Sequence, residues 1–409
     1  MNETPKGSRL HIALFGRRNA GKSSLINALT NQDIALVSDV PGTTTDPVYK
    51  AMEILPIGPV MIIDTAGIDD VGELGEKRVA RSLQVLNKAD VALLVIDSQA
   101  EISNYEIELA EKVIEKKIPL LVVANKTDLK PFSEAQAKDW EEKLKALPIP
   151  VSAIQKLGIE KLKKTLIAKA PDDWEGTPVI GDLVQGGDTV VLVVPIDLAA
   201  PKGRLILPQV QTIRDLLDHD AFCLVVKERE LKRALENLKE PPKLVVTDSQ
   251  EFLKVAADTP PEVLLTSFSI LFARHKGDLN TLVAGARAVD QLQPGDKILI
   301  AEGCTHHRQA DDIGQVKIPR WLRQHVGGEL EFDWVAGSQF PDDLSPYRLI
   351  IHCGSCMLNR REMLHRLAMA REQNVPIVNY GVLIAHLHGI LSRALRPFPL
   401  AKMIYEDEE

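Results

Sequence analysis

A phosphate-binding loop is indicated near the start of the chain, where residues 16–23 read GRRNAGKS and match the pattern G-x-x-x-x-G-K-S. Gly16 and Gly21 allow the backbone to curl tightly and to approach phosphates closely. The backbone N–H groups of such a loop, and of the helix that follows it, face the anion. We therefore expect a nucleotide to bind residues Asn19, Ala20, Gly21, Lys22, Ser23 and Ser24, with Lys22 on the β- and γ-phosphates and Ser23 on Mg²⁺.

Two polar segments that follow this loop have the character of nucleotide-dependent switches. Residues 39–46 read DVPGTTTD, and the hydroxyl of Thr43, Thr44 or Thr45 is a candidate ligand for Mg²⁺. Residues 64–67 read DTAG, in which Asp64 can bind Mg²⁺ through water and Gly67 can donate its N–H to the γ-phosphate. The predicted catalytic residues are accordingly Lys22, Thr44, Asp64 and Gly67. The acid that orients the attacking water is left open among Asp69, Asp70 and Glu73.

Selectivity for guanine is indicated by residues 125–128, which read NKTD. The Asp128 carboxylate can accept two hydrogen bonds from the N1–H and 2-amino groups of guanine, a donor pair that adenine lacks. The Lys126 stem can cover the base, and Asn125 can brace the surrounding loops. Ser152 and Ala153, within the segment PVSA, can offer backbone N–H groups to the guanine oxygen. The motifs together predict a GTPase that binds GTP/GDP with Mg²⁺.

The elements that must position these motifs are strands of a parallel sheet. Apolar runs at residues 11–15, 60–63, 90–96 and 119–124 read as buried strands, and the motifs follow their ends. These residues resemble the translation-factor-like GTPases, in the family that includes the tRNA-modification GTPase TrmE and Era. The resemblance implies that Asn19 holds K⁺ beside the phosphates. It also implies slow, K⁺-stimulated hydrolysis, because Ile68 stands where Ras-like enzymes have a water-orienting Gln.

A second chemical centre is indicated by three cysteines in the last third of the chain. Cys304 follows an apolar run at residues 297–301, and Cys353 and Cys356 follow another at 348–351. In a parallel sheet such strand ends share one edge, so the three thiols can meet there, flanked by His306 and His352. Three thiolates with an open fourth position suit a 4Fe–4S cluster, with His307, Asp311 and Asp312 as candidates for a fourth ligand. A zinc half-site, a redox dithiol and two core histidines are the alternatives.

Two further α/β domains are expected after a turn-rich segment at residues 169–178. Apolar runs at 189–196, 221–226, 243–246 and 263–271, with amphipathic stretches at 209–217 and 229–238, predict a small unit that serves self-association or acts as a spacer. The last domain is expected to end with a helix at 359–371, a strand at 375–380 and a helix at 382–395. We expect Cys223 to be a buried apolar residue and His365, His386 and His388 to be structural.

Composition narrows the function classes. The chain has 409 residues, a length that favours several domains. Its net charge of −8 argues against a surface that binds nucleic acid. Its first residues lack the apolar core of a signal peptide, and no apolar run is long enough to span a bilayer. We therefore expect a cytoplasmic protein with no membrane or nucleic-acid partner.

The pattern C-x-H at Cys304–His306, followed far downstream by H-C-x-x-C at 352–356, resembles the HydF family, the maturation GTPase of di-iron hydrogenase. Residues 310–322 resemble the same family. The resemblance implies an α/β fold with a P-loop GTPase domain at 1–172, a dimerisation domain at 178–265 and a doubly wound cluster-binding domain at 270–400. It also implies a homodimer, or a tetramer, that carries a di-iron subcluster precursor, with radical-SAM maturases and the apo-[FeFe]-hydrogenase as partners.

Two other functions are compatible with parts of the sequence. One is a ribosome- or RNA-associated GTPase whose last domain is a zinc-binding module, although the acidic balance counts against it. The other is a redox sensor that uses Cys353 and Cys356 as a dithiol, which leaves Cys304 unexplained.

Overall fold

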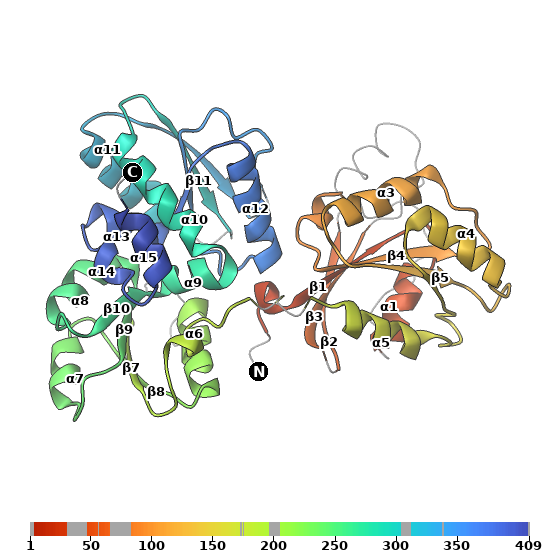
Figure 1. The fold of residues 1–409 in the computed structure, drawn as a ribbon, viewed down its shortest axis with the longest axis horizontal. Helices are drawn as coiled ribbons and strands as arrows, with labels where there is room; N and C mark the ends of the chain where they lie inside the picture. Colours follow the sequence, from red (N-terminus) through yellow and green to blue (C-terminus); the bar gives the residue numbers. More distant parts are fainter. Residues whose placement is uncertain are drawn as a thin grey trace. The chain divides into compact units, whose positions relative to one another are not determined.

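The chain forms two compact units, residues Met1–Glu175 and Gly176–Glu409 (Figure 1). The computed structural model describes residues 4–30, 47–55, 57–65, 83–171, 174, 176–195, 205–303, 312–337 and 339–407. Among these residues, every helix is too short or too polar to cross a bilayer.

The first unit is built on a six-stranded sheet in the order β2-β3-β1-β4-β5-β6. Its strands are β1 (Leu10–Phe15), β2 (Val48–Ile54), β3 (Gly58–Asp64), β4 (Val91–Asp97), β5 (Leu120–Asn125) and β6 (Pro148–Pro150). Only β2 runs antiparallel to its neighbour, β3, and the other pairs are parallel. The carboxyl ends of β1, β3, β4 and β5 therefore lie at one edge, where Leu14 pairs with Asp64.

Helices cover both faces of this sheet. All six side chains of β1 are buried, and because successive side chains of a strand point to opposite faces, both faces must be covered. Leu10, Ile12 and Leu14 pack with residues of α1 (Lys22–Thr30) and α5 (Ile159–Lys169). Ala13 and Phe15 face the opposite core, with residues of α3 (Asn104–Glu115) and α4 (Glu134–Leu144). Figure 1 shows the two helix pairs on opposite sides of the sheet.

The second unit contains two four-stranded parallel sheets. The first has the order β10-β9-β7-β8, with β7 (Thr189–Val193), β8 (Phe222–Val226), β9 (Leu244–Thr247) and β10 (Leu264–Ser267). The second has the order β12-β11-β13-β14, with β11 (Lys297–Glu302), β12 (Glu331–Ala336), β13 (Leu349–His352) and β14 (Ile377–Asn379). One hydrophobic core joins them, because Val190 and Leu192 of the first sheet and Ile298 and Ile300 of the second belong to it.

The helices of the second unit surround these sheets. In the first half they are α6 (Leu207–Asp218), α7 (Leu231–Asn237) and α8 (Phe252–Asp258). Then follow α9 (Phe268–Lys276), α10 (Leu279–Ala284), the short helix η4 (Gly285–Gln291), η5 (Ile313–Lys317), α11 (Ile318–Val326) and α12 (Arg360–Glu372). The chain ends with α13 (Tyr380–Leu387), α14 (Leu391–Ala394) and α15 (Pro399–Glu406).

Local capping explains where the structure departs from the expected elements. The apolar run at 263–271 is a strand only as far as Ser267, whose hydroxyl accepts from the Ile270 N–H and begins α9. The single helix expected at 382–395 is two helices, α13 and α14, with Gly389 between them in a left-handed conformation at φ 70°. Strands β2, β6 and β12 were not predicted, and β2 adds an antiparallel edge to the first sheet. The α/β class is as predicted.

His275 in α9 is expected to make the stability of the second unit depend on pH. Its Nδ1–H donates to the Thr177 carbonyl at 2.7 Å, and burial is the main reason that its pKa falls from 6.5 to about 4. Between these values the unfolded chain binds more protons than the folded chain does, so stability should decline as pH falls through this range. Thermal unfolding of the full chain measured from neutral pH downwards checks this, and His275→Gln should reduce the slope of unfolding temperature against pH. An unchanged slope in the variant would contradict the assignment to His275.

Candidate functional site

The phosphate-binding loop joins the end of β1 to the start of α1. Gly16 has φ 146°, and a Cβ atom there would lie 2.2 Å from the Val95 carbonyl oxygen, so only glycine fits. The Lys22 ammonium donates to the carbonyl oxygens of Gly16 at 2.8 Å and Arg17 at 3.1 Å. It thereby lies over the concave side of the loop, where the phosphates of a nucleotide would be bound.

Asn125 ties three separate motifs of the first unit together. Its Nδ2 donates to the Ala20 carbonyl at 2.9 Å, and its Oδ1 accepts from the Ala153 N–H at 3.1 Å. The close approach also explains Gly21, because a Cβ atom there would lie 2.2 Å from Asn125 Nδ2. The phosphate loop, the NKTD segment and the PVSA segment are thus held by one buried amide.

Asp64 ends β3 beside this loop, and its carboxylate is in an unusual environment. Its Oδ1 is buried with no hydrogen-bond partner among the described residues. Burial raises the pKa of Asp64, and the positive charges of Lys22 and Lys50 oppose that rise. A buried acceptor without a donor, close to an ammonium group, suits a hydrated Mg²⁺ ion. The residues present therefore fit the magnesium site expected from the sequence.

The base-recognition residues lie in the loops after β5 and β6. The Ser152 hydroxyl donates to Asp128 Oδ1 at 2.6 Å, which orients the carboxylate expected to bind guanine. Lys126 has φ 65°, and its ammonium lies 2.9 Å from Asp97 Oδ2. The hydrogen bond between the Ser152 hydroxyl and Asp128 was not predicted from the sequence, which indicated only a role for the Ser152 backbone N–H.

The remaining predicted nucleotide-site residues fall into two groups, those outside the described residues and those in or beside the phosphate loop. Thr43, Thr44, Thr45 and Gly67 lie outside the described residues, as do Asp69, Asp70 and Glu73. Ser23 and Ser24 lie in the first turn of α1 with half-buried side chains, and Asn19 is exposed in the loop at φ 59°.

Cys353 and Cys356 lie just after the end of β13 in the second unit, at the wall of a cavity of about 260 Å³. The cavity lies at the carboxyl edge of the second sheet, where Ala301 pairs with His352. Its other polar lining includes Glu302 and Tyr380, and Phe268, Phe272 and Ile384 contribute apolar lining. The Asp312 carboxylate, one of the candidates for a fourth ligand, also lines it, and its Oδ1 accepts from the N–H groups of Gly314 and Gln315.

Two backbone N–H groups lie within hydrogen-bond distance of the Cys353 sulfur. Burial raises the pKa of this thiol, yet its Sγ accepts from the Gly303 N–H at 3.0 Å and from the Ser355 N–H at 3.5 Å. Such bonds favour the charged form, which is the form that binds metals. Gly303, whose N–H contacts Cys353 Sγ, is the residue directly before Cys304 in the sequence. Cys304, His306, His307 and Asp311 themselves lie outside the described residues.

His352 is fully buried and does not line the cavity. Its Nε2 accepts from Arg366 Nη1 at 2.9 Å, so its Nδ1 carries the proton and donates to the Cys353 carbonyl at 3.0 Å. Burial and the Arg366 charge lower the pKa of His352 to about 3. Both ring nitrogens are engaged in this arrangement, so the geometry favours a positioning role over the predicted ligand role, which stays a prediction.

Sequence reasoning missed the contributions of Arg366, Glu302 and Tyr380. Arg366 is 1% exposed and also donates to the Gly337 carbonyl and to Glu362 Oε1. The Tyr380 hydroxyl donates to Glu302 Oε1 at 3.2 Å, and burial raises the pKa of Tyr380 well above its ordinary value. Glu302 directly follows the apolar run 297–301, which is the signal that could have identified it.

Three family models match successive parts of the chain. Residues 280–397 match a model described as the hydrogen maturase F tetramerization domain, and residues 179–277 match its dimerization domain. Residues 11–126 match a model described as a 50S ribosome-binding GTPase.

The MnmE relatives match only the GTPase part of the chain. The tRNA modification GTPase MnmE of Thermoanaerobacter sp. strain X514 is 40% identical over 159 residues, which are 38% of this chain and 34% of that protein. MnmE of Aquifex aeolicus is 38% identical over 165 residues, 40% of this chain and 35% of that protein. The chain thus spans about a third of the length of these relatives. The solved FeoB G-domain of Methanococcus jannaschii is 26% identical, with a TM-score of 0.31, and covers 40% of this chain and 99% of that domain.

Removing the amide bridge should weaken both folding and nucleotide binding. In Asn125→Ala, the Ala20 carbonyl and the Ala153 N–H lose their partner, at a cost of roughly 1–3 kcal/mol for each buried group. Denaturant unfolding and titration with GTP measure the two effects. The control is Gln155→Ala, which removes an exposed amide from the same loop and should change neither. Equal behaviour of the two variants would show that the bridge has no energetic role.

Proposed function

Because the chain belongs to the hydrogen maturase F family, we propose that it is a GTPase and iron–sulfur scaffold that delivers a di-iron precursor to an apo-[FeFe]-hydrogenase. The GTPase domain supports GTP hydrolysis and the binding of GTP/GDP with Mg²⁺ in general. The family's dimerization and tetramerization domains support self-association. The cluster, the cargo and the hydrogenase and radical-SAM maturase partners are the parts that we propose.

The observation that carries the scaffold proposal is the cavity beside Cys353 and Cys356. It lies at the edge of a parallel sheet, where ligands bind in doubly wound folds, and two backbone N–H groups already point at Cys353 Sγ. We propose that Cys304, Cys353 and Cys356 hold a 4Fe–4S cluster. The cluster would supply an exchangeable iron position for the cargo.

His352, in this proposal, sets the position of the cysteine loop. Its proton is held on Nδ1 toward the Cys353 carbonyl because Arg366 occupies Nε2. The proposal also keeps His306 as a predicted ligand of the cluster and Ser23 as a predicted ligand of Mg²⁺. Asp312 remains one of the candidates for the fourth ligand position of the cluster.

Hydrolysis by this chain should depend on K⁺ through Asn19. The exposed Asn19 side chain lies in the phosphate loop, where a bound K⁺ would add a positive charge beside the phosphates. We expect turnover to fall by about tenfold when Na⁺ replaces K⁺, which is about 1.4 kcal/mol of transition-state stabilisation. Phosphate release measured in the two salts checks this. Asn19→Ala should lose the difference and Arg18→Ala, its exposed neighbour, should keep it, whereas equal turnover of the unchanged chain in both salts would refute the assignment.

The cluster proposal predicts the metal content of matched cysteine variants. Reconstitution with iron and sulfide without oxygen should give about four irons per chain, and Cys304→Ser, Cys353→Ser or Cys356→Ser should lose them. Cys223→Ser is the control, because Cys223 lies in β8, where burial raises its pKa to about 11. Lys22→Ala should abolish hydrolysis and keep the iron.

The alternatives give different results in the same experiment. One stoichiometric zinc ion in place of iron would favour the zinc-module GTPase. A chain that binds neither metal but forms a reversible Cys353–Cys356 disulfide would favour the redox dithiol. Delivery itself is tested by adding the loaded protein to an apo-hydrogenase and measuring hydrogen evolution.

A further inference from the structure

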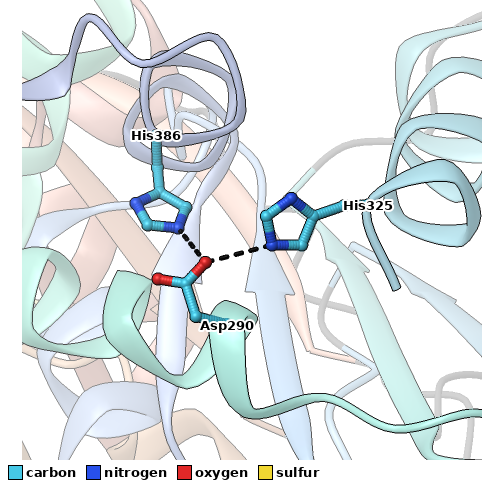
Figure 2. A group of neighbouring side chains, drawn as sticks. All are labelled: Asp290, His325 and His386. Carbon is cyan, nitrogen blue, oxygen red and sulfur yellow. Dashed lines mark hydrogen bonds and ion pairs between the residues drawn. The ribbon is translucent and has the colours of Figure 1, made fainter. Parts of the chain in front are cut away.

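Three metal-ligating side chains meet on the second unit, and none of them lines the cysteine cavity. Asp290 is in η4, His325 is in the last turn of α11, and His386 is in the last turn of α13. Figure 2 shows both imidazole rings turned toward the Asp290 carboxylate. Asp290 Oδ1 lies 3.0 Å from His325 Nε2 and 3.1 Å from His386 Nε2, and all three ligand atoms lie within 4.8 Å of one another.

These separations are close to those of a bound zinc ion. Ligand atoms about 2.0–2.2 Å from a tetrahedral Zn²⁺ are roughly 3.3 Å apart. Small shifts of the two exposed groups, Asp290 and His325, therefore admit an ion between the three ligand atoms. Two imidazoles and one carboxylate form a ligand set that suits zinc and leaves a fourth position open to water.

The surroundings of His386 support a metal-binding tautomer. Its side chain is 8% exposed, and its Nδ1 lies 3.0 Å from the Tyr405 hydroxyl in α15. With a metal on Nε2, Nδ1 carries the proton and donates to the Tyr405 hydroxyl. A hydrogen bond from the second ring nitrogen orients metal-bound histidines in general, although the acceptor is usually a carboxylate, a backbone carbonyl or water. The Tyr405 backbone is held in turn, because its carbonyl accepts from Arg287 at 3.2 Å.

The electrostatic environment also favours a cation. Both histidines lie in the last turns of their helices, where the helix dipole is negative, and Asp290 adds a full negative charge. Without a metal, the same atoms form two hydrogen bonds from Nε2–H groups to one carboxylate oxygen. The two states require opposite proton positions on His386, so they can be distinguished by experiment.

We propose that Asp290, His325 and His386 bind one divalent transition-metal ion of the zinc class. The ion would link η4, α11 and α13, which are distant in sequence and all lie within residues 280–397. A ligand that binds only the folded chain stabilises it, so zinc should raise the unfolding temperature of the second unit.

The test uses the full chain with Cys304, Cys353 and Cys356 all changed to Ser, so that the thiols cannot bind the added metal. Calorimetric titration with Zn²⁺ should give about one ion per chain, with a rise in unfolding temperature. Asp290→Asn, His325→Ala and His386→Asn should each weaken the affinity by at least about tenfold, because removal even of outer-shell partners costs about 10–100-fold. Substitution with Co²⁺ should give visible bands of a nitrogen and oxygen site.

The matched control is His219→Ala. His219 Nδ1 lies 3.7 Å from Asp215 Oδ1, a histidine–carboxylate pair outside the three-residue group, and its loss should leave zinc affinity unchanged. Should His386→Asn fail to fold, His325→Ala, at an exposed position, still tests the site, with circular dichroism to confirm the fold. Absence of stoichiometric binding, or equal binding by the His325→Ala and His219→Ala variants, would overturn the proposal and leave the group as hydrogen bonds alone.

Discussion

Parallel pairing of strands is the constraint on which both sheet-edge sites depend. It carries the ends of β1, β3 and β5 to one edge of the first sheet, so that the phosphate loop, Asp64 and Asn125 meet there although they are far apart in sequence. The pairing of β11 with β13 does the same for Glu302 and Cys353 in the second unit. Each site therefore inherits its geometry from backbone hydrogen bonds, and its side chains only complete it.

Polar groups at such buried edges have lost their contacts with water, so each needs a hydrogen-bond partner within the protein. Asn125 uses both ends of its amide on backbone groups, and His352 uses both ring nitrogens on Arg366 and the Cys353 carbonyl. Asp64 Oδ1 differs, since it is buried and has no partner among the described residues. This contrast separates groups that hold the fold from a group that is left available for an ion.

The sequence predicted the sheet-edge features because they are local. G-x-x-x-x-G-K-S, NKTD and C-x-x-C each combine neighbouring residues with a preceding apolar strand, and hydrophobic patterning predicts such strands. The order of the strands within each sheet was not predicted from the sequence. Boundaries were less predictable, since Ser267 begins a helix and Gly389 separates two helices within stretches that were each expected to continue. The role of Arg366 could not be predicted, because its partners Gly337 and His352 come from other segments and only the folded chain brings them together.

The Asp290 group shows the same limit more sharply. His325 and His386 are separated from each other and from Asp290 by whole elements, and each lies on a helix where a histidine is ordinarily structural. No strand edge gathers them, so no periodicity or spacing in the sequence marks them as neighbours. Their convergence comes from packing of α11 and α13 on the core that also holds the second sheet. A site of this kind tolerates small changes in helix packing poorly, because ligand atoms must stay within a few tenths of an ångström of metal-bond distance. Its metal affinity would therefore report on the packing of these helices, one of which, α13, also carries Tyr380 and Ile384 of the cysteine cavity.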